Sequence, residues 1–413
     1  MSTSTIFKFP SVICRQHQGP LGIHIDTYEA LLGEHGYSRS STYVHLHIVA
    51  DLSRWLKRQR LDVDDVDERT VARYLQSRRR FVNGYRGAAS VPYKFLGMLR
   101  DQGMVNHKSM PVAVDACEVA IANFKQYLSQ ERGLSLSIQY NYARFADRFL
   151  RERFGRGSVQ FSKLSATDIT KFVRRHAHKG SACSAQHMVG SLRAFLRYLR
   201  YQGEITTDLA ACVPKVANWS HSALPRFLQP GQVQQVLDHS DRHSAVGLRN
   251  YAILLLLARL GLRACEIVAM TLDDIDWEAG HLIVRGKGGQ RAQMPLPAEV
   301  GRAIAVYLRK GRPSCASRHL FIREHAPRVG FANSAAVSTL VQRALADAAV
   351  DSPHTGAYVF RHSLATEMLR QGASLGEIGQ LLRHAHPDTT QIYAKVDVQA
   401  LRPLALRWPG GGR

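Results

Sequence analysis

The sequence predicts a mainly α-helical protein with one small β-hairpin, and three observations lead to this prediction. Apolar residues recur three and four positions apart over most of the chain, which is the spacing of amphipathic helices. The first half contains two copies of one helical pattern. Two short strand-like runs, residues 281–285 and 291–296, flank a glycine turn, which is typical of a β-hairpin.

The repeat in the first half covers residues 28–105 and 125–205. The first copy contains Leu31, Glu34, Gly36, Ser38 and Tyr43, and the second contains Leu128, Glu131, Gly133, Ser135 and Tyr140, each 97 positions later. The copies close with FLGMLRDQGMV (95–105) and FLRYLRYQGEI (195–205). Helical periodicity explains the shared apolar positions but not the shared Gly, Ser and Gln-Gly residues. We therefore expect two similar units of four or five short helices each.

Lapses in the helical pattern divide the chain into domains and linkers. Pro111 lies in the first lapse, and Pro214 and Pro225 lie in the second, where proline disfavours a continued helix. We expect an N-terminal extension (1–24), a first helical domain (25–105), a linker (106–116), a second helical domain (117–205), a linker (206–225), a third domain (226–400) and a C-terminal tail (401–413).

The chain is strongly basic: its 413 residues include 55 Lys and Arg against 33 Asp and Glu, a formal net charge of +22. The excess is spread over the chain and is densest in residues 117–224, so a polyanion such as nucleic acid would contact several domains. Arginine bias from a high-GC genome is the alternative source of this charge. Arg193, Arg197 and Arg200 share one face of a predicted helix, either as a ridge that faces phosphate or as a solvated face.

Composition excludes several other classes of protein. Hydrophobic residues make up 45% of the chain and charged residues 21%, which is ordinary for a globular protein. The longest apolar run, residues 251–258, is eight residues long and too short to cross a bilayer. The six cysteines are scattered and no secretory signal is readable, so we expect a reduced, cytoplasmic setting.

Turns place several polar residues of the third domain. An apolar helix, NYAILLLLARLGL (250–262), ends at Gly261, which puts Arg263 at the start of the next helix. The predicted hairpin has Lys287 at its tip within GKGG (286–289), a motif that is weak by itself. The acidic residues at 273, 274, 276 and 278 lack the spacing of a calcium loop and predict a solvated turn.

The C-terminal part predicts a second convergence of polar side chains. Arg361 opens a helix, and Ser374 with Glu377 forms a capping box for the next one. That second helix ends at His384, and Tyr393 follows on a short helix. Helix starts, ends and turns are places where side chains converge on a site. A zinc site is not expected, because His384 and the histidine two positions later lack two further ligands.

Residues from about 227 to 400 resemble the catalytic domain of the tyrosine recombinases, the phage integrase family. The resemblance rests on GLRACE (261–266), GKGG (286–289), RHSLAT (361–366) and LLRH (381–384), followed nine residues later by Tyr393. Residues 117–205 resemble the family's helical core-binding domain. With the internal repeat, this implies two tandem N-terminal SAM-like DNA-binding domains and an integrase-type catalytic domain.

The resemblance implies site-specific cleavage and rejoining of DNA through a 3′-phosphotyrosyl intermediate. Tyr393 would attack the scissile phosphate and free a 5′-hydroxyl. Because a tyrosine hydroxyl has a pKa near 10, it needs assistance to act as a nucleophile at neutral pH. Arg263 and Arg361 would hold the non-bridging oxygens, a task that suits the fork geometry and permanent charge of guanidinium groups. No metal or cofactor is implied, since these cations carry the positive charge.

The same resemblance assigns the proton transfers and an orienting carboxylate. Lys287 would protonate the departing 5′ oxygen. His384 would hydrogen-bond the phosphate or assist proton removal from Tyr393. Glu266, one turn after Arg263, would orient an arginine or a histidine.

Two positions depart from the family pattern. The family usually has histidine three residues before its second arginine, where this chain has Tyr358. Tyrosine can donate one hydrogen bond to a phosphate oxygen but cannot bring positive charge. The usual glycine before the histidine of the last motif is replaced by Arg383. Both arginines, the lysine, the histidine and the tyrosine are present, so the resemblance implies an active enzyme.

Three functions are compatible with these features. The first is a site-specific recombinase, integrase or transposase. It would act on double-stranded DNA sites in the nucleoid of the cytoplasm, as a homo-oligomer that is tetrameric in the synaptic complex, with accessory recombinases as further partners and no membrane partner. The second is a type IB topoisomerase, which reseals DNA without exchanging partners. The third is a decayed recombinase that only binds DNA. The apolar tail would dock on a neighbouring protomer, which favours the first function, or pack on its own domain.

Overall fold

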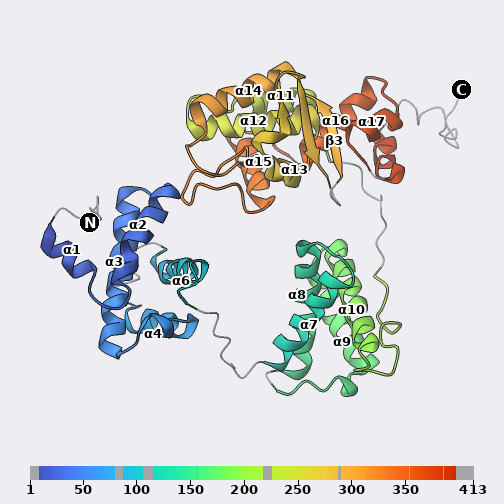
Figure 1. Ribbon diagram of the computed structural model, residues 1–413. Helices are drawn as coiled ribbons and strands as arrows, with labels where there is room; N and C mark the ends of the chain where they lie inside the picture. Colours follow the sequence, from blue (N-terminus) through green and yellow to red (C-terminus); the bar gives the residue numbers. More distant parts are fainter. Residues whose placement is uncertain are drawn as a thin grey trace, which may run out of the picture. The chain divides into compact units, whose positions relative to one another are not determined.

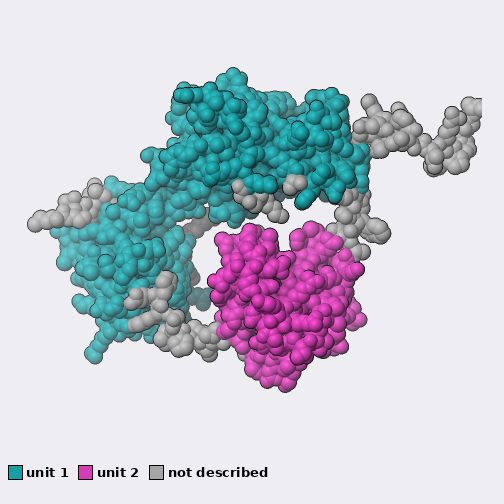
Figure 2. Space-filling view, turned by 45° about the vertical axis from the view of Figure 1, so that its right-hand side comes forward, with its two compact units in different colours: residues 1–107, 223–413 teal, residues 108–222 magenta. Residues whose placement is uncertain are grey.

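A computed structural model gives the fold, which is mostly helical with one three-stranded sheet and confirms the predicted fold class (Figure 1). The structure describes residues 9–79, 87–105, 115–155, 157–216, 226–286, 290–352, 354–384 and 386–396. The chain forms two compact units, residues 1–107 with 223–413 and residues 108–222 (Figure 2). Within the described ranges, no helix is both long and apolar enough to span a membrane.

The N-terminal part of the first unit is a helical bundle with its own apolar core. Its α-helices are α1 (Pro10–Gln16), α2 (Ile25–Glu34), α3 (Arg39–Gln59), α4 (Glu68–Ser77) and α6 (Val91–Asp101). Aromatic rings fill the centre: the ring centroids of Tyr28 and Phe95 are 5.0 Å apart, and those of Trp55 and Tyr74 are 5.8 Å apart. Both pairs meet edge to face, a favoured arrangement of aromatic rings.

The second unit has a comparable succession of helices, α7 (Ala116–Gln130), α8 (Leu136–Phe154), α9 (Ala166–His176) and α10 (Ala182–Tyr201). Phe124, Phe149, Phe172 and Phe195 form the centre of its core, each at most 2% exposed. The prediction of short helices is wrong for α3, α8 and α10, which have 21, 19 and 20 residues. Buried residues recur three and four positions apart from Thr42 to Leu56 on α3 and from Ala185 to Leu199 on α10, so the apolar spacing contains no signal that ends these helices early.

Residues shared by the two copies of the repeat have the same local roles. Gly36 and Gly133 both adopt a positive φ, +73° and +55°, two residues before the serines that precede α3 and α8. A residue with a side chain would be strained there. Phe95 and Phe195, which open the closing segments, are both fully buried. A β-carbon at Gly36 would also come within 2.4 Å of Arg328 Cδ, whereas at Gly133 no such contact exists within 4 Å. The turn requires glycine at both positions and close packing requires it at Gly36, and apolar periodicity reports neither.

Two segments expected at domain boundaries pack onto the helical cores. Residues 9–24, expected as an extension, contain α1 and the fully buried Leu21. Residues 206–216, expected as part of a linker, place Leu209 and Val213 in the core of the second unit. The backbone of residues 206–216 is irregular, and helical periodicity does not detect packing by such segments.

The C-terminal part of the first unit surrounds one apolar helix, α12 (Ala245–Leu260). Its residues 253–257 are at most 1% exposed, as expected for a helix that is apolar on every face. The other helices described in this part are α11 (Pro230–Asp238), α13 (Ala264–Ala269), α14 (Ala298–Val306), α15 (Ala335–Asp347), α16 (Tyr358–Arg370), α17 (Leu375–Leu381), the 3-10 helices η6 (Leu272–Asp274), η9 (Pro387–Thr389) and η10 (Gln391–Val396), and the π-helix η8 (Tyr307–Gly311). Both α14 and α16 pack directly on α12.

The sheet of this part is antiparallel, with strand order β1 (Ile275–Asp276), β2 (His281–Arg285) and β3 (Arg291–Pro295). β2 and β3 form the predicted hairpin, in which Leu282 pairs with Met294 and Val284 with Ala292. Leu282 and Val284 are buried while their neighbours on β2 are not, the alternation of a strand with one face on a core.

The acidic turn before the sheet differs from the prediction at one residue. Asp274 is 3% exposed rather than solvated. Its Oδ2 accepts a hydrogen bond from the backbone N–H of Thr271 at 2.8 Å, and its Oδ1 pairs with Arg285 at 2.7 Å. A buried carboxylate requires such partners, and here they tie the turn to the hairpin.

Candidate active site

The end of α12 places the first arginine of the site. The helix stops at Gly261, whose φ of +57° lies in the left-handed region. A side chain added at Gly261 would come within 2.8 Å of Leu382 Cδ2, so the position requires glycine for both backbone and space. Arg263 then occupies the position just before α13, in agreement with the sequence-based expectation.

Glu266 holds Arg263 at two points. Its Oε1 accepts a hydrogen bond from Arg263 Nη1 at 2.7 Å, and its Oε2 accepts one from the Arg263 backbone N–H at 2.8 Å. Glu266 is only 2% exposed. Because this buried carboxylate is tied to the backbone of Arg263 and also accepts from its guanidinium, it orients the Arg263 side chain.

Arg361 lies on the first turn of α16 and is fully buried. Its Nη1 donates to the carbonyl oxygen of Gly261 at 2.6 Å, and its Nη2 donates to that of Leu382. The guanidinium thereby joins the ends of α12 and α17 to α16. Its buried Nε has no hydrogen-bond partner among the described residues, which is costly unless a ligand offers an acceptor. Burial, followed by Arg263, lowers the pKa of Arg361 to about 10, so it is still a cation at neutral pH.

Tyr393, on η10, is 1% exposed. Its hydroxyl oxygen is 3.1 Å from Nδ1 of His362. Burial and then Tyr358 raise the pKa of Tyr393, whereas Arg361 and Arg263 act in the opposite direction. The hydroxyl is therefore protonated at neutral pH and needs a proton acceptor before it can act as a nucleophile.

Sequence reasoning missed His362, which contacts that hydroxyl. Its ring centroid is 4.6 Å from that of Tyr358 and 5.6 Å from that of Tyr393. Burial, then Arg361, lowers the pKa of His362 to about 4. The ring is uncharged at neutral pH, and Nδ1 accepts from the hydroxyl when Nε2 carries the ring hydrogen. The sequence contained an indication of this residue, because His362 lies one helical turn after Tyr358 and is therefore on the same face of the helix.

His384 follows α17 and lies near the same cations. Its Nδ1 is 2.7 Å from Oγ1 of Thr390, while its buried Nε2 has no partner within the described part of the chain. Burial, then Arg361 and Arg263, lowers the pKa of His384 to about 4. At neutral pH it therefore acts through hydrogen bonding or as a proton acceptor rather than as a cation.

Most of the site residues predicted from the sequence lie together. The structure brings together Arg263, Glu266, Arg361, His384 and Tyr393. Tyr358, at the start of α16, lies at the edge of this group and is 43% exposed. Lys287 lies outside the described residues. Arg383, noted in the sequence only as a departure, pairs with Glu266 at 2.9 Å and belongs to the group.

The arginines predicted as a ridge on α10 have three different environments. Arg193 Nη2 donates to two backbone carbonyl oxygens of residues 206–216, each at 3.0 Å. Arg200 pairs with Asp208 at 3.1 Å, and Arg197 is exposed. The guanidinium of Arg193 is therefore used within the second unit. Of the three arginines of the predicted ridge, only Arg197 and Arg200 are exposed.

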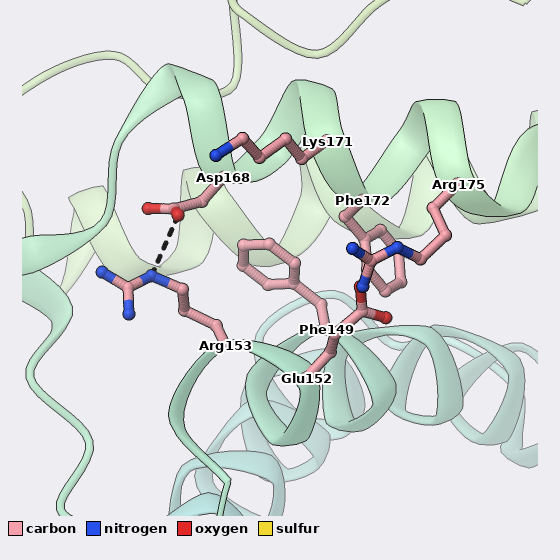
Figure 3. Close-up of a pocket in the computed structure, with 7 residues that line it drawn as sticks. All are labelled: Phe149, Glu152, Arg153, Asp168, Lys171, Phe172 and Arg175. Atoms are coloured by element: carbon pink, nitrogen blue, oxygen red, sulfur yellow. Dashed lines mark hydrogen bonds and ion pairs between the residues drawn. The ribbon is translucent and has the colours of Figure 1, made fainter.

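A hollow of about 140 Å³ lies between α8 and α9 of the second unit (Figure 3). On its wall, Arg153 Nε pairs with Asp168 at 3.0 Å, and Arg175 pairs with Glu152. Each arginine is thus neutralised by a neighbouring carboxylate, which does not favour an anion site. None of the residues that line the hollow belongs to the predicted catalytic group.

Two family models match the chain: the phage integrase family over residues 226–400 and the phage integrase N-terminal SAM-like domain over residues 121–203. The chain is 42% identical to "Putative integrase/recombinase y4rA" of Sinorhizobium fredii over 402 residues, which are 96% of this chain and 97% of that protein. It is 31% identical to tyrosine recombinase XerD of Mycobacterium tuberculosis over 309 residues, 70% of this chain and 96% of that protein.

Solved structures have the same fold. The XerH recombinase in a post-cleavage complex with palindromic difH substrate matches with a TM-score of 0.55 and 18% identity, over 75% of this chain and 93% of that chain. A lambda integrase (75–356) dimer bound to a COC′ core site matches with a TM-score of 0.52 and 17% identity, over 67% and 94%. The resemblance predicted from the four motifs is thereby confirmed, and the chain belongs to the phage integrase family of tyrosine recombinases.

Proposed function

We propose that this protein is a site-specific DNA recombinase. In this proposal the Tyr393 oxygen attacks the scissile phosphorus, forms a 3′-phosphotyrosyl bond and releases a 5′-hydroxyl. The 5′-hydroxyl released in the same way from the partner duplex then attacks the phosphotyrosyl phosphorus, which joins the exchanged strands and frees Tyr393. Several relatives are named tyrosine recombinases, and the similar XerH and lambda integrase structures are complexes with DNA. The net charge of +22 suits a partner with a phosphate backbone.

The cations and unpaired donors around Tyr393 are the observation that supports this proposal most directly. Arg361 and Arg263 both favour the phenolate form of Tyr393. Arg361 Nε and His384 Nε2 are buried without acceptors among the described residues. A phosphate between these groups would offer the acceptors. The pentavalent transition state carries more concentrated negative charge than the ground state, so donors already fixed in place favour it.

Two histidines can take the phenolic proton. His362 already contacts the hydroxyl, and His384 is likewise uncharged at neutral pH. As the oxygen–phosphorus bond forms, the proton passes to one of these rings, and the departing 5′ oxygen takes a proton that the family resemblance assigns to Lys287.

The proposal includes a movement of η10. Tyr393 is 1% exposed and Arg361 is fully buried, so a DNA phosphate reaches them only if the segment that covers them shifts. Such a step would restrict cleavage to protein that is engaged with its DNA site.

The proposal also covers assembly and domain roles. Exchange between two duplexes requires cleavage of all participating strands, and each chain contributes one Tyr393. We therefore expect a tetramer on paired sites, which accessory recombinases could join.

Residues 25–105 and 117–205 are the proposed DNA-binding domains, and residues 226–400 are the proposed catalytic domain. The tail 401–413, proposed to dock on a neighbouring protomer, lies outside the described residues. This reaction implies that the protein works in the nucleoid.

Covalent capture tests the proposal. Purified full-length protein is incubated with fragments of the genome that encodes it, covalent complexes are isolated under denaturing conditions, and the attached DNA is sequenced. The recovered site is then used as a nicked suicide duplex, which traps the phosphotyrosyl intermediate. We expect Tyr393→Phe to abolish capture while duplex binding persists, because phenylalanine lacks the attacking oxygen.

Tyr251→Phe, a substitution of the same kind on α12, is the matched control and should leave capture unchanged. Capture by the Tyr393→Phe protein would contradict the nucleophile assignment. Relaxation of supercoiled DNA by monomers without a paired site would instead support a type IB topoisomerase, and binding without capture by the unsubstituted protein would support a DNA-binding relic.

A further inference from the structure

Arg383 has a backbone conformation that is unusual for its residue type. Its φ is +54°, in the left-handed region where a β-carbon is disfavoured and glycine is not. Among the described residues, Arg60 and Ala349 are the other non-glycine residues with positive φ. When such a conformation occurs beside an active site, the side chain is a candidate for a function that glycine could not perform.

The side chain of Arg383 reaches the carboxylate that orients Arg263. Its Nη2 donates to Glu266 Oε2 at 2.9 Å, and its Nη1 donates to the carbonyl oxygen of Leu381 at 3.0 Å. The side chain is 14% exposed, so water competes little for these bonds. The carbonyl oxygen of Arg383 also accepts a hydrogen bond from Arg263 Nη2 at 3.5 Å. Arg383 thus contacts Arg263 directly and through Glu266.

Arg263 and Arg383 share one buried carboxylate. Glu266 offers Oε1 to Arg263 and Oε2 to Arg383, so the three side chains together carry one net positive charge. Without Arg383, the carboxylate would neutralise Arg263, and its Oε2 would keep only the Arg263 backbone N–H as a partner. A carboxylate held less firmly can rotate, and the guanidinium that it holds would rotate with it.

We infer that Arg383 is a positioning residue, which holds Glu266 so that Arg263 is presented to the scissile phosphate in one orientation and with its positive charge not cancelled. This inference rests on the proposed function, because the contact of Arg263 with phosphate is part of that proposal. Both Nη atoms of Arg383 donate to protein acceptors, and its Nε is buried without a hydrogen-bond partner among the described residues. We therefore place the action of Arg383 on Glu266, which its contacts reach directly and through Arg263, and not on the DNA. The loss of Arg383 should slow the cleavage of bound DNA and change the affinity for DNA little.

Single-turnover cleavage of the nicked duplex recovered by capture, at saturating full-length protein, tests this inference. Arg383→Ala keeps the disfavoured φ and removes the guanidinium, whereas Arg383→Gly removes both. We expect each to cleave about thirtyfold more slowly than the unsubstituted protein, with duplex affinity within about twofold. Arg383→Lys retains the charge and should lose only about threefold.

A double-substitution cycle distinguishes positioning from a general loss of structure. Because Arg383 acts through Arg263, Arg383→Ala should slow cleavage no further when Arg263→Ala is already present. A further loss of about thirtyfold in that background would overturn the inference. Unchanged cleavage by both Arg383→Ala and Arg383→Gly would overturn it as well.

Ala349 offers the control for backbone strain. It is exposed with φ +50°, so Ala349→Gly relieves the same conformation and should leave cleavage unchanged. If circular dichroism shows that Arg383→Ala is partly unfolded, Arg383→Gln, which keeps donors but not charge, takes its place with the same expected loss. Absence of covalent capture by the unsubstituted protein would reject the proposed function. Capture by that protein with equal rates for the Arg383 variants would reject only the role of Arg383.

Discussion

The arginines of the candidate active site differ from those of α10 in what holds their guanidinium groups. Arg361 is fully buried and donates to two backbone carbonyls, and Arg263 is fixed by Glu266. On α10, Arg197 is exposed, and Arg200 pairs with an aspartate that is itself about half exposed. Groups already fixed in place can stabilise a transition state, whereas exposed cations mainly attract the phosphate backbone. Under the proposed function, this difference predicts two roles for the positive charge of the chain.

Substitution of Arg361 should have the largest effect on this comparison. Arg361→Lys keeps a positive charge but cannot donate to both carbonyls with the same fork geometry. We expect single-turnover cleavage to slow by about a thousandfold, because the phosphate loses an oriented donor. The free energy of unfolding, measured with urea, should fall by about 1–3 kcal/mol, because a buried carbonyl loses its partner.

Arg302→Lys, at an exposed position of α14, is the matched control and should change neither quantity. If Arg361→Lys slowed cleavage less than about tenfold, fixed geometry would not distinguish the active-site arginines, and the comparison with α10 would fail.

The pH dependence of stability tests whether the histidines of the active site are buried and uncharged. The pKa values of His362 and His384 are lowered, mainly by burial, from 6.5 to about 4. Between pH 6.5 and 4 the unfolded chain therefore binds more protons at these histidines than the folded chain does. The free energy of unfolding is unaffected by them above pH 6.5 and falls as the pH is lowered toward 4. From pH 7 to 5, the free energy of unfolding should fall by about 1–2 kcal/mol per histidine.

Urea unfolding of His384→Gln at both pH values measures this contribution. The variant should lose about 1–2 kcal/mol less than the unsubstituted protein between pH 7 and 5, because glutamine does not titrate. His325→Gln, at a side chain that is 91% exposed, is the control and should show the unsubstituted pH dependence. Equal losses in His384→Gln and the unsubstituted protein would contradict a buried, neutral His384.

Substitution of Arg197 should have the smallest effect. Arg197→Ala removes an exposed cation, so duplex affinity should fall only a few fold and the slope of log affinity against log salt should decrease in magnitude by about 1. Cleavage at saturating protein should not change. A loss of cleavage without a change in the salt slope would mean that Arg197 acts in cleavage as the fixed arginines do, which would contradict the comparison.

Local features of the site could be predicted from the sequence. Gly261 ends α12, Arg263 precedes α13, and the capping box of Ser374 and Glu377 starts α17, all as expected. Each depends on residues within about one helical turn, where backbone hydrogen bonding and side-chain chemistry are decided locally. The strands of the hairpin followed for the same reason.

Contacts between distant segments could not be predicted in this way. The Tyr393 hydroxyl meets His362 across 31 positions, and Arg383 meets Glu266 across 117. The packing of Val213 on the second core depends on irregular backbone that has no sequence period. These contacts depend on how distant segments pack together. The spacing of residues along the chain gives no information about that packing.

The sequence by itself determined the helical class, the repeat, the family and the residue types available for phosphate chemistry, because motifs and periodicity are properties of neighbouring residues. Only the tertiary structure decided which arginines are fixed and which are free to meet solvent. Arg361 is buried because carbonyls 100 and 21 positions away converge on it, while Arg197 remains exposed on α10. Burial and partner choice follow from the packing of remote segments, and they separate arginines that the sequence presents alike.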